Sequence, residues 1–228
     1  MEDRSAPLWP EQSAETRASG FRWIPIRSLS TRHKPRIAAH LLTLDARDRY
    51  LRFGWNASDT QIVRYVDGMN FERDEIYGVF NRRLELVAMA HLAFAGALDA
   101  EPCAEFGVSV LPTQRGRGMG ARLYDHACMH ARSRGVDTLV IHALTENSAM
   151  LAIARRHGAS VVHEGGEALA KLRLPAPRLA THMEALLQSH AANADFGLKA
   201  QAFQVGVWVQ ALAEVREGVM ATGQMAAE

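Results

Sequence analysis

Glycine and arginine residues gather in one short stretch of the chain, where an apolar run gives way to a helical pattern. The stretch, residues 110–127, reads VLPTQRGRGMGARLYDHA and contains Gly116, Gly118 and Gly120. Glycine allows close approach of the backbone to a ligand, and a helix N-terminus presents unpaired N–H groups to an anion. Arginine side chains add charge-assisted hydrogen bonds to the same anion. The stretch therefore predicts a phosphate-binding turn.

Three phosphate-binding motifs can be compared with this turn. A P-loop requires Lys and then Ser or Thr after its last glycine, whereas Ala121 and Arg122 follow Gly120. GRGMGA does match the dinucleotide pattern G-x-G-x-x-A, but four residues separate it from the preceding apolar run and the next strand ends without an acidic residue for a ribose. The third pattern, R/Q-x-x-G-x-G/A, is met by residues 115–120. A plain turn with an exposed basic edge is the remaining alternative.

On these residues the chain resembles the GNAT N-acetyltransferase family, in which this segment binds the pyrophosphate of acetyl-CoA. AEFGVSVLPTQRGRGMG resembles the central strand and loop of the family, including Glu105 before the motif. TLVIHALTENSAMLAIARRHGA resembles the strand and helix that follow, with Asn147 at the usual Asn position. The resemblance covers residues 20–175 and implies a cofactor-binding loop made of Arg115, Gly116, Arg117, Gly118, Met119 and Gly120.

The resemblance implies direct transfer of an acetyl group from acetyl-CoA to a primary amine of a small molecule, amino acid or peptide. Backbone groups of Val108, Ser109 and Val110 would bind pantetheine, and an N–H near Val110 would face the developing oxyanion. Glu105 matches the position of a general base, which an ammonium with a pKa of about 10 requires. A structural ion pair is an equally open interpretation of Glu105. Asn147 is expected either to hold pantetheine or only to cap its helix.

One position departs from the family pattern. Family members often carry a Tyr seven residues after the Asn, which protonates the thiolate, and this chain has Ala154 there. His142, Tyr124 and His157 are possible substitutes, although a core histidine, a core tyrosine and a helix-ending histidine are simpler interpretations. The departure leaves a second function open, a non-catalytic acyl-CoA-binding sensor or regulatory module of the same fold. No metal site is predicted.

The segment DRYLRFGW, residues 48–55, lies between the first two predicted helices. We expect a loop here, and the resemblance places it over the acceptor site. Its Arg49, Arg52, Phe53 and Trp55 would suit an anionic or aromatic group. If the arginines face the cleft, a carboxylate-bearing amine is favoured. A packed loop whose aromatic residues fill the core is an equally open interpretation.

The periodicity of apolar residues predicts the elements that position these side chains. We expect strands at 21–29, 75–80, 84–95, 103–111, 138–144, 159–163 and 168–174, and helices at 32–44, 60–69, 119–134 and 149–157. The strand–helix–strand order after residue 103 implies a locally parallel pair, whereas the hairpins are antiparallel. The predicted fold is α/β, a twisted mixed sheet of about six or seven strands flanked by helices.

Composition and charge indicate the class of protein, and the residue patterns predict three regions along the chain. The 228 residues carry a net charge of +1, with 48% hydrophobic and 22% charged residues, which argues for a globular domain and against nucleic-acid partners. Two cysteines without metal or redox spacing favour free thiols in the cytoplasm, and no apolar run is long enough for a membrane span. We expect a disordered lead-in at 1–19, the N-acetyltransferase domain at 20–175, and a helical C-terminal extension at 178–228. The extension would pack back on the domain or form a homodimer contact.

Overall fold

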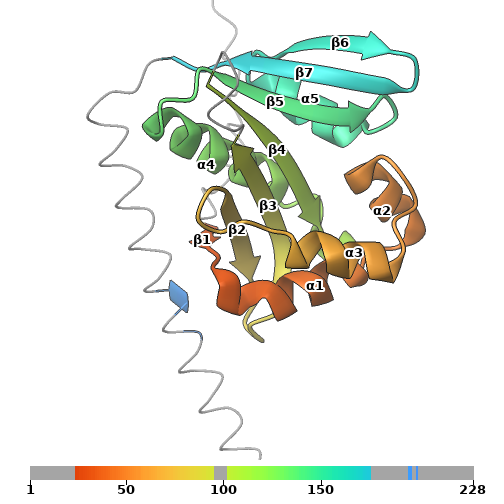
Figure 1. The fold of residues 1–228 in the computed structure, drawn as a ribbon, viewed down its shortest axis with the longest axis vertical. Coiled ribbons are helices and arrows are strands. Elements are labelled where there is room, and N and C mark those ends of the chain that lie inside the picture. The colour runs from red at the N-terminus through yellow and green to blue at the C-terminus, as the bar shows by residue number, and fades with distance from the viewer. Residues whose placement is uncertain (1–23, 95–101, 176–194, 197–198, 200–228) are drawn as a thin grey trace, which may run out of the picture.

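The computed structural model describes residues 24–94, 102–175, 195–196 and 199 (Figure 1). Its described part forms one seven-stranded mixed sheet in the order β1-β2-β3-β4-β5-β7-β6. Only β4 and β5 pair in parallel, so the predicted fold class and the parallel pair are confirmed. The strands are β1 (Arg27–Ser28), β2 (Glu75–Phe80), β3 (Leu86–Phe94), β4 (Cys103–Val110), β5 (Thr138–Leu144), β6 (Ser160–Glu164) and β7 (Glu167–Arg173).

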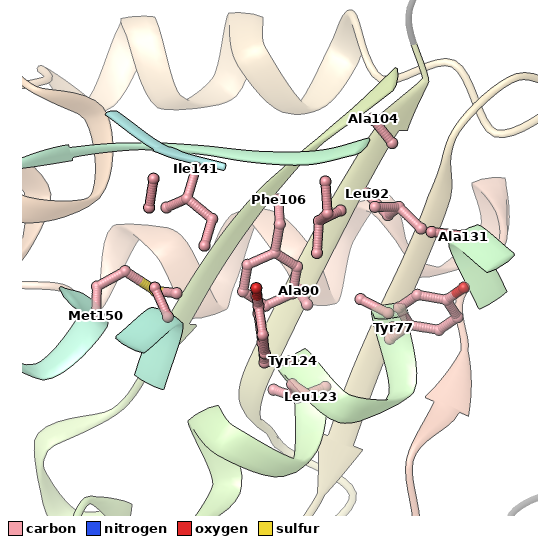
Figure 2. Packing of buried hydrophobic residues seen from close by; sticks show 14 of the residues in the cluster. Tyr77, Ala90, Leu92, Ala104, Phe106, Leu123, Tyr124, Ala131, Ile141 and Met150 are labelled. Carbon is pink, nitrogen blue, oxygen red and sulfur yellow. The ribbon is translucent and has the colours of Figure 1, made fainter. Parts of the chain in front are cut away.

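Helices cover both faces of the sheet, with α1 and α3 on one face and α4 and α5 on the other (Figure 1). On the α4 face, Tyr124 packs edge-on against Phe106 of β4 with ring centroids 5.1 Å apart (Figure 2). On the opposite face, Ile37 and Ile62 pack with Met89 of β3. The helices are α1 (Lys34–Leu42), α2 (Ala46–Phe53), α3 (Asp59–Asp67), α4 (Met119–Ser133) and α5 (Ser148–Arg156), with short 3₁₀ turns at η1 (Thr31–His33) and η2 (Pro112–Gln114).

The expected loop over the acceptor site is wrong, because residues 46–53 form helix α2. Asp45 caps this helix by accepting a hydrogen bond from the Asp48 backbone N–H at 2.7 Å, and Gly54 ends it in the left-handed conformation with φ of 84°. The inner face of α2 carries Asp48 and Arg52, which line a cavity instead of a core. The segment therefore lacks the regular spacing of apolar residues that would have predicted a helix.

The N-terminal strand is shorter than predicted. Residues 27–28 pair with β2, residues 24–26 are not in a strand, and residues 21–23 lie outside the described part of the chain. The helix predicted at 32–44 is preceded by a short 3₁₀ turn, because Thr31–His33 form η1, which Ser30 precedes.

Strands β4 and β5 separate along their length. They pair only from Cys103–Thr138 to Glu105–Val140, whereas β3 continues to pair with β4 as far as Val110. Residues 106–110 therefore have a sheet neighbour on one side only. This divergence opens the sheet at its centre.

The expected C-terminal extension is described only at Asp195, Phe196 and Lys199. The Phe196 ring lies 5.2 Å from the Phe80 ring and 3.8 Å below the Arg27 guanidinium, so this point of the extension packs on the domain. The helical content of the rest, the homodimer contact and the lead-in lie outside the described residues. Across the ranges that the structure describes, no helix has both the length and the apolar character needed to cross a membrane.

Candidate acyl-CoA and acceptor site

The divergence of β4 and β5 creates a cleft with a cavity of about 920 Å³. Residues 105–110 of β4 line it, with the glycine-rich turn following the Val110 end of the strand. Arg52 of α2 lies over Gly107, and residues of α3, β5 and α5 complete the lining. Among the described residues, no group of three or more His, Cys, Asp or Glu side chains is arranged to hold a metal ion. The cleft therefore offers backbone groups, one glycine turn and a few charged side chains.

Unpaired backbone groups of β4 line the gap. The Leu111 N–H donates to the Val87 carbonyl at 3.0 Å, which fixes which residues of β4 bond to β3. Because successive residues of a strand point their backbone groups to opposite sides, Val108 and Val110 face the gap, whereas the Ser109 backbone faces β3. The Val110 carbonyl accepts a hydrogen bond from Arg115, so the backbone groups of Val108 and the Val110 N–H are those available to a polar chain, such as an amide-containing arm, lying along β4.

The glycine turn leads into the first residues of α4. Gly116 and Gly118 have φ values of 72° and 76°, a region that favours glycine, and Gly118 is the N-cap of the helix. A Cβ at Gly120 would lie 3.3 Å from Ile153 Cδ1, so this glycine lets α4 approach α5. The turn thus exposes the N-terminal N–H groups of a fifteen-residue helix to the cleft.

The two arginines of the turn bond to neighbouring residues. Arg115 Nη2 lies 2.6 Å from Asp48 Oδ2 of α2, and its Nε donates to the Val110 carbonyl at 3.2 Å. Arg117 donates to Gln114 within the turn at 3.1 Å. The Arg115 contact joins the turn to α2, the helix that the sequence analysis missed.

Asn147 caps α5 and also reaches α2. Its Oδ1 accepts a hydrogen bond from the Met150 N–H at 3.2 Å, and its Nδ2 donates to the Leu51 carbonyl at 3.2 Å. The capping half of the prediction is confirmed. Asn147 also lines the cleft.

Glu105 and His142 form a pair at the centre of the cleft. Glu105 Oε1 lies 3.3 Å from His142 Nδ1, and the two side chains are 57% and 62% exposed. The core interpretation of His142 is therefore wrong, because β5 turns this side chain away from the core and into the cleft. Sequence alternation along β5 places Ile141 in the core and His142 on the other face.

The remaining proton-donor candidates lie elsewhere. Ala154 is fully buried, and Tyr124 is buried with its phenol beside the Cys128 thiol. Burial raises the pKa of Tyr124 above its usual range and the pKa of Cys128 to about 12. His157 caps the end of α5 and contacts Asp125 at 2.5 Å, which confirms the helix-ending interpretation. Neither Tyr124 nor His157 lines the cleft.

The two arginines of α2 have different surroundings. The Arg49 guanidinium donates to the carbonyls of Leu42, Leu44 and Ala57 and pairs with Asp59 at 2.7 Å. The structure therefore does not bring Arg49 into the cleft, because the side chain holds the ends of α1, α2 and α3 together. Arg52, in contrast, lines the cleft together with Phe53 and Trp55.

Sequence reasoning missed a hydrogen-bonded chain beside Arg52. Arg52 Nη2 donates to the Tyr65 hydroxyl at 3.0 Å, and this hydroxyl lies 2.7 Å from His91 Nδ1. His91 Nε2 lies 3.1 Å from Asp74 Oδ2. These residues come from α2, α3, β3 and the turn before β2, so no local spacing signals them.

His40 is a second residue that the sequence did not reveal. Its Nδ1 donates to the Leu86 carbonyl at 2.9 Å, and its Nε2 accepts from the Ser109 hydroxyl at 2.8 Å. Burial lowers the pKa of His40 to about 4, which keeps the ring neutral. The Ser109 side chain therefore attaches α1 to the floor of the cleft.

The splayed sheet and the glycine turn define an acyl-CoA-dependent acyltransferase fold of the GNAT type. The model of the acetyltransferase (GNAT) family matches residues 41–159, more than half of the chain, and the chain belongs to this family. Comparison with curated proteins gave no match.

Solved structures share the fold at low sequence identity. The GNAT domain of S. lividans PAT is 20% identical, with a TM-score of 0.56, over 65% of this chain and 89% of that one. An N-acetyltransferase from Staphylococcus aureus Mu50 is 14% identical, with a TM-score of 0.51, over 68% and 100%. A Salmonella typhimurium structure described as an acetyltransferase with its cofactor acetyl-CoA is 16% identical, with a TM-score of 0.50, over 69% and 99%.

Proposed function

We propose that the protein transfers an acetyl group from acetyl-CoA directly to a primary amine of a small molecule, an amino acid or a peptide. One observation carries the proposal. The backbone groups of Val108 and the Val110 N–H, which face the gap, lie between the glycine turn and the Glu105–His142 pair. A pantetheine arm along β4 would place its thioester beside a carboxylate that can accept a proton.

The chain supplies three kinds of interaction to the donor. The N–H groups of residues 115–120 and the Arg115 side chain bind the diphosphate, and Val108 and Val110 bind the arm. Acetyl-CoA itself supplies a thioester with a thiolate leaving group. A backbone N–H that faces the gap, at Val110 or at Val108, stabilises negative charge on the carbonyl oxygen. Asn147 holds the start of α5 against α2 and contributes its amide to the wall of the cleft.

Glu105 acts as the general base. The amine enters as an ammonium and must lose a proton before its lone pair can attack. Glu105 is exposed enough to take that proton directly or through a water molecule. His142, 3.3 Å away, passes the proton on towards solvent.

The leaving thiolate receives its proton from water. Ala154 offers no proton donor at the position of the family's Tyr, and neither Tyr124 nor His157 lines the cleft. A thiol with a pKa of about 8.5 is a tolerable leaving group near neutral pH. The same observation favours the second candidate function, a non-catalytic acyl-CoA sensor, because such a module needs no acid.

The test is acetyl-CoA-dependent release of free thiol across a panel of primary amines. We expect release with at least one amine, and a loss of about 100- to 1,000-fold in kcat/KM for Glu105→Gln, because the base is removed. Glu72→Gln, an exposed carboxylate outside the cleft, is the matched control and should keep wild-type activity. Acetyl-CoA binding without thiol release for any amine would support the sensor instead.

A further inference from the structure

Arg52 lies directly on the floor of the cleft, above a glycine. A Cβ added at Gly107 would lie 2.7 Å from Arg52 Nη2, so the missing side chain at this position is what admits the guanidinium. Gly107 follows Glu105 by two residues on the same face of β4. The guanidinium is therefore about 7 Å along the strand from the proposed base.

The positive charge of Arg52 has no carboxylate partner within the described residues. Two other arginines near the cleft do have a carboxylate partner, since Arg49 of α2 pairs with Asp59 and Arg115 of the glycine turn pairs with Asp48. Arg52 donates only to the neutral Tyr65 hydroxyl, and its buried Nε has no hydrogen-bond partner. The guanidinium also lies over the rings of Phe53 and Tyr65, 5.2 and 5.7 Å from their centroids, so an anion in the cleft would be its first charged partner among the described residues.

Tyr65, His91 and Asp74 form a hydrogen-bonded chain that holds the Arg52 guanidinium in place. Burial alone would raise the pKa of Asp74, but hydrogen bonds from Arg73 and His91 lower it, so Asp74 is ionised. His91 then donates from Nε2 to Asp74 and accepts at Nδ1 from Tyr65.

Each link of this chain has one donor and one acceptor. Because the Tyr65 proton points to His91, its oxygen lone pairs are turned towards Arg52. Burial also lowers the pKa of His91, which keeps the ring neutral, as this arrangement requires. Such a chain orients a cation for a ligand and does not neutralise it.

We propose that Arg52, oriented by Tyr65, His91 and Asp74, binds the carboxylate of the acceptor, and that the acceptor is a free amino acid. This inference rests on the proposed function and narrows it. One molecule must place its amine at Glu105 and its carboxylate at Arg52, about one strand repeat away. An amino acid spans that distance with one hydrogen bond at each end.

The experiment measures kcat/KM for acetylation of the common L-amino acids, each beside its own carboxamide. The amide keeps the side chain and replaces the carboxylate by a neutral group. It also lowers the pKa of the amine to about 8, which favours the amide in the reaction, so a preference for the acid is not explained by the amine. Wild-type protein should prefer at least one acid over its amide by about 10-fold or more. Arg52→Gln should lose about 10- to 100-fold on that acid, the effect of one charge-assisted hydrogen bond, and less than about 3-fold on the amide.

Two further variants separate recognition from structure. Arg47→Gln removes an equal charge from an exposed position of the same helix, outside the cleft, and should leave both substrates unchanged. Tyr65→Phe should raise KM for the acid about 3- to 10-fold with kcat unchanged, since it loosens the guanidinium only. An equal effect of Tyr65→Phe on acid and amide would indicate a merely structural role for the chain and would overturn this part of the proposal.

Failure of the proposed function can be told apart from failure of this inference. If acetyl-CoA binds but no amine releases thiol, calorimetry with the same acid and amide pairs on the CoA-saturated protein carries the test. Binding of the acid in preference to the amide, lost in Arg52→Gln, supports the anion site. No binding of any acid, equal binding of acid and amide, or equal loss of both in Arg52→Gln overturns it.

Discussion

The two ends of the cleft are built from different parts of the chain. The proposed cofactor end comes from one continuous segment, residues 108–120, and offers mainly backbone N–H groups. The acceptor end comes from α2, α3, β3 and the turn before β2, and offers side chains such as Arg52 and Tyr65. Backbone recognition needs a local conformation that glycine spacing encodes. Side-chain recognition needs residues that only folding brings together.

The largest effect is expected at Gly118, where a substitution should weaken CoA binding at the proposed cofactor end. Gly118→Val places a β-branched residue at φ of 76°, where it is strained, so the N–H cradle should rearrange and the Kd for CoA should rise about 100-fold or more. Calorimetry with CoA measures the change. Gly135→Val, equally strained at φ of 74° but at the far end of α4, is the matched control and should bind CoA as wild type does. Unchanged CoA affinity in Gly118→Val would contradict the assignment of the turn.

An intermediate effect is expected at His40, which supports the floor that both ends share. The folded-state pKa of about 4 lies below the ordinary histidine pKa of 6.5, so the unfolded state binds more protons between these values. The free energy of unfolding should therefore be fully retained above pH 6.5. It should fall by up to about 3 kcal/mol as the pH drops towards 4, since one pKa unit corresponds to about 1.36 kcal/mol.

Denaturant titration at several pH values measures this dependence. His40→Gln should be less stable at pH 7 and lose most of the decline, whereas His163→Gln, at an exposed site on β6, should retain it. A decline of the same size in His40→Gln would mean that other groups cause it.

The smallest expected effect concerns the contact that joins the ends. Asp48 of α2 holds Arg115 of the turn at 2.6 Å, and its carboxylate opposes a diphosphate bound there. Asp48→Asn should tighten CoA binding by about 3-fold, the scale of one partly exposed ion pair. Asp59→Asn, which breaks the other Asp–Arg pair of α2, should leave the Kd for CoA unchanged. Weaker binding in Asp48→Asn would show instead that the pair holds the turn in its binding shape.

The sequence predicted the elements whose signals are local. The apolar run at 138–144, the helix after Gly118 and the strand pair joined at 81–83 all appear in the structure, because each depends on periodicity or turn chemistry within a few residues. Helix α2 escaped prediction because its inner face meets a cavity and carries polar residues. The sequence also left open whether the His142 side chain lies in the core or in the cleft, because the residues of a mostly apolar strand do not show which face of the strand is covered.

The sequence by itself determined the family and the mixed sheet, and it predicts a cofactor turn in which Arg115 marks Gly118 and Gly120. Tertiary structure alone decided that Arg49 serves the scaffold, whereas Arg52, three residues later on the same helix, lies above Gly107 without a carboxylate partner among the described residues. Both arginines look alike in sequence, because a charged side chain reports nothing about its partners until distant segments fold around it. Backbone geometry is a local property of the chain, whereas the neutralisation of a charge is a property of the whole fold.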